Sequence, residues 1–333
     1  MSAWIVPAFL VAAGVSLVAS TRLVRSLEFI GTRLGAPQIL LGLVVALAAD
    51  GPELTSAVTA QIRGQRAIGV GVLFGSNVFN IAVLLGFGSV IAGGALFHRR
   101  VVLLEGVTAL GIAATCVALV TGVVGPVVAL TITLAFFVPY VVFSAVPMQR
   151  LGLPAAWRRW LSEALREEEE EVAEAYSSAL SGSASAAGLT AAVSLLVVIV
   201  ASAVMEHVAA VGGADLGWPP VIVGGVVLAA VTSLPNAVAA VYLARAGKGT
   251  AMLSEAMNSN TLNVVGGLML PAALAGITLD RVGAGIVFSA SSYLAMTALA
   301  VMAAYAGHGL GRRAGWLLML VYAGFLAALV ATS

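Results

Sequence analysis

The chain has 333 residues, of which 61% are hydrophobic and 9% charged, and its formal net charge is +1. Soluble domains carry about 25% charged residues, so this composition excludes an ordinary soluble protein and predicts an all-α polytopic membrane protein. The near-neutral charge gives no sign of nucleic-acid binding, and a single cysteine, Cys116, cannot form an internal disulfide.

Ten apolar segments follow one another along the chain, which predicts ten membrane spans. No basic stretch precedes the first, so we do not expect a cleaved signal peptide. The segments form a first five-helix repeat (residues 1–148), a linker (149–186) and a second five-helix repeat (187–333). Their expected ranges are 4–19, 37–62, 67–92, 101–121, 125–147, 187–211, 219–244, 250–277, 282–306 and 314–331.

Two carboxylates, Asp50 and Glu53, lie in the middle of the second segment with Gly51 and Pro52 between them. A carboxylate in the bilayer interior costs about 2.5 to 3.5 kcal/mol even on the mildest scale, so two of them indicate a function. Pro52 has no N–H and disfavours helical angles at the residue before it. We therefore expect a helix break over residues 48–52 that leaves unpaired carbonyl oxygens beside two acids, an arrangement that suits a hard cation.

This stretch is duplicated. Residues 38–81 align without a gap on residues 221–264, at an offset of 183. Proline, glycine, serine and asparagine stay in register, which predicts a transporter built from repeats with its site where they meet. The equivalent pairs include Pro52 and Pro235, Ser76 and Ser259, Asn77 and Asn260, and Asn80 and Asn263.

The positive residues predict the orientation. With the N-terminus outside, thirteen Arg and Lys residues fall in the loops on the cytoplasmic side and three (Arg63, Arg66 and Arg281) on the outer side. Because each half has an odd number of spans, the two repeats are predicted to be inverted relative to each other.

The linker contains the acidic run REEEEEVAEAY, residues 166–176, followed by SSALSGSASAAG, a flexible connection. Adjacent glutamates point around a helix instead of converging. We therefore expect a solvated helix between the halves, with a regulatory cation site as the alternative.

The two broken helices and the helices that follow them resemble the calcium/cation antiporter superfamily, in its sodium/calcium exchanger branch. GPEL at 51–54 and GSNVFN at 75–80 are similar to the family pattern, as are TSLPN at 232–236 and NSNTLN at 258–263 with changes. The resemblance implies exchange by alternating access, in which the first and sixth spans slide past the other eight. It also implies ligation by backbone carbonyls at the breaks and cation binding by Glu53, Ser76, Asn80, Thr232, Ser233, Asn236, Ser259 and Asn263.

The chain departs from the family pattern at its acids. Where this chain has Asn236 the family usually has glutamate, and where it has Asn263 the family often has an acid. At the first break, the family usually has Thr-Ser in place of Ala49 and Asp50. An amide oxygen still binds a cation but brings no charge. Asp50 is a possible ligand or a helix N-cap, because Asp50 and Glu53 have capping-box spacing.

Glu255 is a further candidate. It shares one helix face with Ser259 and Asn263 and lies toward the cytoplasmic end of its span. It could replace the charge missing at Asn236 or relay a proton, or it could pair with Lys248 or Arg245. Glu105 and Glu206 lie near segment ends and are expected at the interface.

The leading hypothesis is therefore a secondary cation antiporter of the sodium/calcium exchanger type, without a cofactor, in a bacterial inner membrane. Glu53 alone suits sodium or a proton, whereas Glu53 with Asp50 or Glu255 suits calcium. Sodium/proton and calcium/proton exchange stay open, because clustered acids let a proton compete with a cation. A non-transporting scaffold or cation sensor is a lesser alternative, and no enzyme motif points to catalysis. The site is predicted at the bilayer midplane, with Glu53 and Asn236 facing each other across a pseudo-twofold axis.

Overall fold

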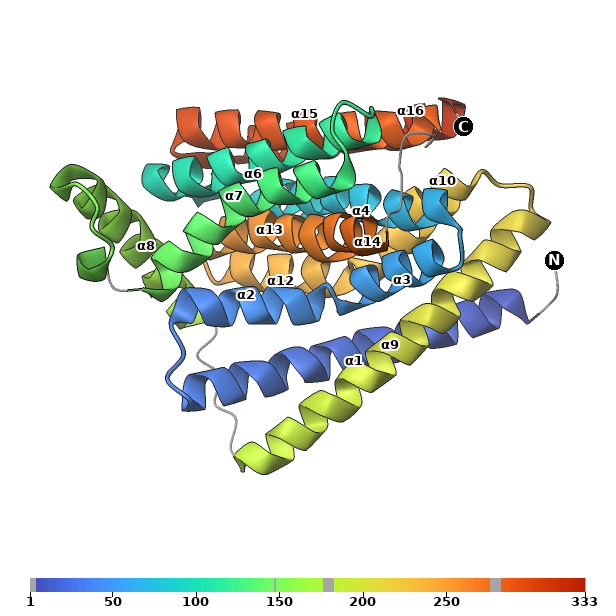
Figure 1. Ribbon diagram of the computed structural model, residues 1–333, viewed down its shortest axis with the longest axis horizontal. Helices are drawn as coiled ribbons and strands as arrows, with labels where there is room; N and C mark the ends of the chain where they lie inside the picture. Colours follow the sequence, from blue (N-terminus) through green and yellow to red (C-terminus); the bar gives the residue numbers. More distant parts are fainter. Residues whose placement is uncertain (1–3, 147, 176–182, 276–282, 333) are drawn as a thin grey trace.

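The computed structural model describes residues 4–146, 148–175, 183–275 and 283–332, and it is a bundle of long helices that run along one axis (Figure 1). Within these residues, seven single helices are long and apolar enough to cross a membrane, and two bent helix pairs pass the same test as single spans. The first half contains α1 (Ile5–Arg33), α2 (Gln38–Ala49), α3 (Gly51–Ile62), α4 (Arg66–Asn80), η1 (Ile81–Phe87), α5 (Gly88–Ala92), β1 (Gly94–Leu96), α6 (Arg99–Val120) and α7 (Pro126–Ala145).

The second half repeats this order after a linker that holds η2 (Met148–Arg150) and α8 (Ala155–Ala175). Its elements are α9 (Ala184–Asp215), α10 (Pro220–Ile222), η3 (Val223–Leu228), α11 (Ala229–Thr232), α12 (Leu234–Arg245), α13 (Gly249–Val264), η4 (Val265–Met269), α14 (Leu270–Ala275), α15 (Ala284–Gly307), β2 (Gly309–Gly311) and α16 (Arg312–Thr332).

One further helix brings the spans to ten: the continuous unit α13–η4–α14, which is the eighth predicted segment in chain order. It is more polar than the other nine spans. Almost every residue of α13 is buried, including Glu255, Asn258 and Asn263. A helix surrounded by other helices meets no lipid, so its polar side chains can bond to its neighbours. Helix α13, like α4, is therefore a central helix of the bundle.

Helix α1 extends well beyond the predicted end of the first segment. The arginines after residue 20 suggested an interface, but the helix continues to Arg33. Leu23 is buried, whereas Arg22 and Arg25 are exposed. The extension is therefore amphipathic, with one face against the bundle.

Helices α1 and α9 lie together in a layer outside the rest of the bundle (Figure 1). The buried hydroxyls of Ser16 and Ser202 join them, with their Oγ atoms 2.8 Å apart. These two helices are the first spans of the two halves, the pair for which the resemblance implies sliding.

The inverted duplication is visible in the backbone. The π-helical segments η1 and η4 follow Asn80 and Asn263, and those residues are equivalent at the offset of 183. The first half also contacts the second at glycines: a Cβ at Gly75 would overlap the carbonyl oxygen of Gly225. The two repeats thus pack at backbone distance.

One end of the bundle, which we call the linker end, gathers the loops predicted to face one side. Strands β1 and β2 pair antiparallel there, with Ala95 opposite Leu310. Helix α8 lies at the same end, and Glu171 Oε2 accepts hydrogen bonds from the backbone N–H groups of Thr250 (2.8 Å) and Ala251 (3.3 Å). The common location of these loops agrees with the predicted grouping of the arginines.

The acidic helix is not simply solvated. Leu161, Ala164, Leu165 and Glu168 of α8 are buried, and the helix packs against α2, α6, α7 and α13. The glutamates point around the helix as expected, since Glu169 and Glu170 are exposed, but the expectation of a solvated helix is wrong for the face with Glu168, which enters the bundle because the helix is amphipathic. Part of the predicted flexible connection, residues 177–182, lies outside the described residues.

Candidate functional site

The two helices that contain the equivalent prolines Pro52 and Pro235 are broken, as predicted. Helices α2 and α3 meet at Asp50 with a bend of 52°, and α11 and α12 meet at Ser233 with a bend of 45°. Pro52 cannot donate to the carbonyl of Ala48, and the Ser20 hydroxyl donates to that oxygen at 3.2 Å instead. The expectation of a wholly unpaired carbonyl at this break is therefore wrong for Ala48, because α1 supplies a donor.

The centre of the site is the side-chain amide of Asn236. Its Nδ2 atom lies within 3.4 Å of four oxygen atoms: Asp50 Oδ1 (2.9 Å), Ser259 Oγ (3.1 Å), Asn80 Oδ1 (3.3 Å) and Glu53 Oε1 (3.4 Å). Ser259 Oγ also donates to Asp50 Oδ1 at 2.6 Å, and Asn80 Nδ2 donates to Ser259 Oγ at 3.0 Å. Because an amide nitrogen has two hydrogens, it cannot satisfy four acceptors, and the oxygens form a cage richer in acceptors than in donors.

This cage confirms one prediction and decides one alternative. Glu53 and Asn236, equivalent residues of the two repeats, are in contact across the molecule. Asp50 makes no side-chain cap of α3, so the N-cap interpretation is wrong: its carboxylate accepts from Asn236 and Ser259. Asp50 lies at the break between α2 and α3, and its side chain points to the second repeat. Its role as a cation ligand stays a prediction.

A second set of contacts crosses the same interface symmetrically. Asn77 Nδ2 donates to the Asn260 carbonyl and Asn260 Nδ2 donates to the Asn77 carbonyl, both at 3.1 Å. The equivalent pair Asn80 and Asn263 donates to Asn260 Oδ1 (3.0 Å) and Asn77 Oδ1 (3.3 Å). These reciprocal bonds are what an inverted repeat with a twofold relation produces. The asparagines hold the two repeats in register behind the cage.

Several buried oxygens at the site have no hydrogen-bond partner among the described residues. Four of them belong to residues that touch one another: Asp50 Oδ2, Glu53 Oε2, Ser233 Oγ and Asn236 Oδ1. Ser233 lies beside Glu53. Buried polar atoms are normally paired, so such a group calls for an explanation. Oxygen atoms without donors are the ligands of a hard cation.

The remaining predicted ligands occupy different positions. Ser76 Oγ donates to Val72 O at 2.7 Å and Thr232 Oγ1 donates to Leu228 O at 2.9 Å, so each hydroxyl bonds to its own helix. Both residues are buried, and their oxygens can still accept. Thr232 also lines a narrow crevice that α1 shares with Pro52 and Pro235.

Glu255 is buried on α13. Its role in charge compensation or proton relay stays a prediction.

Sequence reasoning missed the structural role of Asn77 and Asn260 and the donor Ser20. The asparagine pair had a signal, since both residues stay in register between the repeats. No pattern in the sequence pointed to Ser20, because single serines are common in apolar helices.

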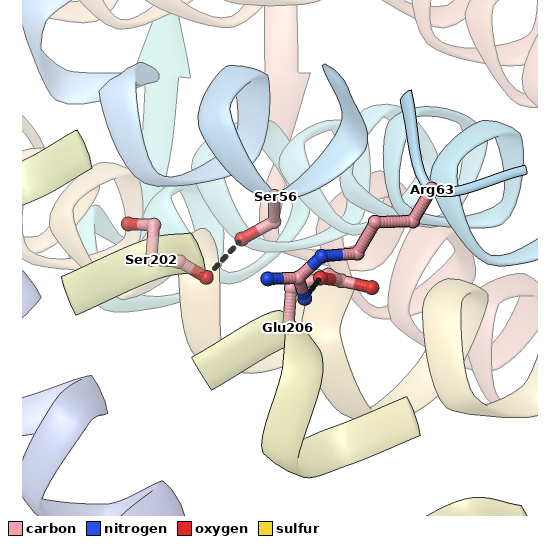
Figure 2. A network of polar contacts seen from close by, with 4 residues as sticks. All are labelled: Ser56, Arg63, Ser202 and Glu206. Atoms are coloured by element: carbon pink, nitrogen blue, oxygen red, sulfur yellow. Dashed lines mark hydrogen bonds and ion pairs between the residues drawn. The ribbon is translucent and has the colours of Figure 1, made fainter. Parts of the chain in front are cut away.

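Helix α9 is joined to α3 by polar contacts beside the site (Figure 2). Ser56 Oγ donates to the Ser202 carbonyl at 3.4 Å, and Arg63 Nη1 lies 2.6 Å from Glu206 Oε2. The Glu206 side chain is fully buried, whereas 40% of the Arg63 side chain is exposed. Glu206 is therefore part of an ion pair between helices, and its expected position at the membrane interface stays a prediction.

The sequence matches a family model described as sodium/calcium exchanger protein over residues 4–148 and 185–331, which is most of the chain. Curated relatives include the sodium/potassium/calcium exchanger 4 of Mus musculus and of Homo sapiens. Each is 32% identical over 136 residues, which cover 39% of this chain and 22% of the relative. The matched region thus spans about a fifth of the length of these relatives.

Two solved structures share the fold. The H+/Ca2+ exchanger CAX superposes with a TM-score of 0.71 at 11% identity, over 99% of this chain and 86% of that one. The sodium-calcium exchanger NCX_Mj gives a TM-score of 0.62 at 19% identity, over 99% and 100%. At these identities the similarity is one of fold: ten helices in two inverted repeats, in an integral membrane protein.

Proposed function

The chain belongs to the sodium/calcium exchanger family, and on that premise we propose that it is a secondary antiporter that carries Ca2+ in exchange for Na+ or H+. The observation that carries the proposal is the oxygen cage around Asn236 Nδ2, built from both repeats. A partly positive amide nitrogen occupies the centre of four oxygens, as a cation would. Rotation of this side chain would turn Asn236 Oδ1 inward and make it a further ligand.

The charge of the cage favours a divalent ion. Asp50 and Glu53 both contact Asn236, so the site holds two carboxylates and can balance two positive charges. A buried divalent cation needs such compensation, because neutral oxygens alone do not offset its lost hydration. Asn80, Asn236, Ser259 and Ser233 add neutral oxygens, and with the carboxylates they supply the six to eight that Ca2+ prefers.

The sliding mechanism that the resemblance implies has a structural support. Helices α1 and α9 form a separate layer that packs against the bent helices through apolar side chains, hydroxyl bonds and an ion pair. Such a layer can slide past a core that its own asparagine bonds hold together. Alternating access would then expose the cage first at one end of the bundle and then at the other.

The orientation follows from the loop charges. We infer that the linker end is cytoplasmic, the N-terminus is outside, and the cage is at the bilayer midplane. The short loops favour a bacterial inner membrane. Domain limits of 1–148, 149–186 and 187–333 separate the repeats from the linker.

The test is calcium uptake into vesicles that contain the purified protein. Radioactive calcium is supplied outside, and the interior is loaded with sodium or adjusted to acidic pH in separate samples. Uptake driven by the sodium gradient identifies Na+ as the counter-ion, and uptake driven by the pH gradient identifies H+. Vesicles with the charge-free variant Asp50→Asn/Glu53→Gln give the background. No uptake above that background with either gradient would overturn the antiporter and support a non-transporting protein.

A further inference from the structure

A second buried polar cluster lies at the linker end, away from the oxygen cage. It consists of Glu105 on α6, Tyr140 on α7, Glu168 on α8, and Ser254 and Asn258 on α13. Glu105 is 3% exposed and Glu168 is 1% exposed. The cluster therefore joins the linker helix to three helices of the bundle through groups that water does not reach.

The hydrogen bonds of this cluster form a directed chain. Asn258 Nδ2 donates to Tyr140 Oη at 3.2 Å, and Tyr140 Oη donates to Glu168 Oε1 at 2.6 Å. The phenol lies farther from Glu105 Oε1, at 3.5 Å. The Tyr140 hydroxyl has one hydrogen, and it donates that hydrogen to Glu168, the nearer acceptor. The chain of hydrogen bonds therefore ends at the Glu168 carboxyl, which lies against the carboxyl of Glu105.

At the end of this chain of bonds, the Ser254 hydroxyl has a single hydrogen, which can serve only one of the two carboxyl groups beside it, so the other still lacks a donor. Glu105 Oε2, Glu168 Oε2 and Ser254 Oγ are buried without a hydrogen-bond partner among the described residues. The Ser254 hydroxyl, 3% exposed, lies beside both carboxyl groups. Two carboxylates in contact and away from water repel each other strongly, and one proton between them removes most of this repulsion.

We propose that Glu105 and Glu168 bind one proton between them, and that this shared proton holds the linker helix α8 against the ends of α6, α7 and α13. The proton supplies the missing hydrogen bond and leaves one negative charge on the pair, which Tyr140 stabilises. When the proton leaves, Glu168 turns to water and α8 separates from the bundle.

The surrounding charges do not neutralise the pair. On α8 and its neighbours, the other ionisable groups are engaged elsewhere or lie outside the chain of bonds. Arg100 pairs with Glu163 at 2.7 Å, His98 lies 3.7 Å from Glu171, and Arg166 pairs with Glu170 at 3.1 Å. Among the described residues, the other ionisable groups of α8, η2 and the ends of α6 and α13 at the linker end are Arg99, Arg150, Arg158, Arg159, Glu169, Lys248 and Glu255.

The direction of the pH effect follows from linkage. Burial raises the pKa of Glu168 to about 7, against the hydrogen bond from Tyr140, which favours the ionised form. The docked helix therefore holds its proton at a pH where the released helix does not. Docking is strongest at acidic pH and weakens as the pH rises through about 7. Between pH 6 and pH 8 the ratio of docked to released helix should fall about tenfold.

The test measures the position of α8 by electron spin resonance distances. Spin labels are attached to cysteines placed at two exposed positions, Ser162 on α8 and Leu96 on β1, in a Cys116→Ala background. In the parent, the short distance between the two labels, which reports the docked helix, should dominate at pH 6. The ratio of the short to the long distance should fall about tenfold by pH 8. Glu168→Gln should keep the short distance at both values, because an amide supplies the hydrogen permanently.

The matched control is Glu170→Gln, on the same helix and with the same change of charge, which should titrate like the parent. Glu105→Gln removes the pair from the other side and should also abolish the pH dependence. The proposal is overturned if the parent distance does not change with pH, or if Glu168→Gln and Glu105→Gln both titrate like the parent. It is also overturned if 1 mM calcium at fixed pH replaces the proton and restores docking, because the pair would then bind a metal.

Discussion

The two repeats share one backbone plan but differ in where they keep their charge. In the first, the helix break has Asp50 and Glu53; at the equivalent positions, the second has Ser233 and Asn236. Despite this, the contacts are reciprocal, since Asp50 touches Asn236 and Ser233 lies beside Glu53. The comparison teaches that the twofold relation fixes the positions of the side chains in the cage, while the sequence of each repeat decides which positions are ionised.

The largest expected effect comes from removing a charge from the first repeat. Glu53→Gln should lower calcium uptake at least about 100-fold, or about 2.7 kcal/mol, because a divalent ion then faces one carboxylate. The amide can still accept from Asn236, so the melting temperature should stay near that of the parent. Radioactive calcium uptake and thermal unfolding measure the two quantities. Near-normal uptake would show that the first repeat does not supply the essential charge.

A charge exchange across the twofold axis tests whether the two repeats offer equivalent positions. Glu53→Asn alone should weaken calcium binding about 100-fold. Glu53→Asn combined with Asn236→Glu should return binding to within about tenfold of the parent, because the carboxylate moves to the equivalent place. Isothermal titration calorimetry with calcium compares the single and double variants. Equal binding by both would mean that the contact does not reflect functional equivalence.

The serines sharpen the comparison further, since Ser76 and Ser259 are equivalent but bonded differently. Ser259 Oγ donates to Asp50 Oδ1, whereas Ser76 Oγ donates to its own helix. Ser259→Ala should therefore weaken calcium binding about fivefold, about 1 kcal/mol, and Ser76→Ala less than twofold. Each is the control for the other in the same titration. A larger loss from Ser76→Ala would reverse the order of importance that the contacts indicate.

The smallest effect concerns an ion pair that only one repeat has. Arg63 pairs with buried Glu206, and the residue equivalent to Arg63 is Ala246. Arg63→Gln should destabilise the protein by about 1 kcal/mol, because a buried carboxylate loses its charged partner while water reaches this exposed position. Adding Glu206→Gln should recover most of the loss. Thermal unfolding of the parent, the single and the double variant checks this, and an unchanged single variant would show that the pair does not hold α9.

Much of the architecture could be predicted from the chain alone. The gapless offset predicted the duplication, Pro52 and Pro235 predicted both helix breaks, and the odd number of spans predicted the inversion. Each of these rests on local chemistry or on counting. The proximity of Glu53 and Asn236 followed from the inversion, since equivalent residues near a twofold axis meet their counterparts.

Only the tertiary structure decided how the polar groups are used. The spacing of Asp50 and Glu53 fits a helix cap as well as a ligand pair, and only the packed second repeat shows that the Asp50 carboxylate bonds to Asn236 and Ser259 instead of capping α3. The burial of Glu105 and Glu168 was equally hidden, because a sequence does not state which face of α8 packs against the bundle. Local sequence determines where a helix can start, break and end. The partners of a buried polar side chain come from residues distant in the chain, and these are brought together only by packing.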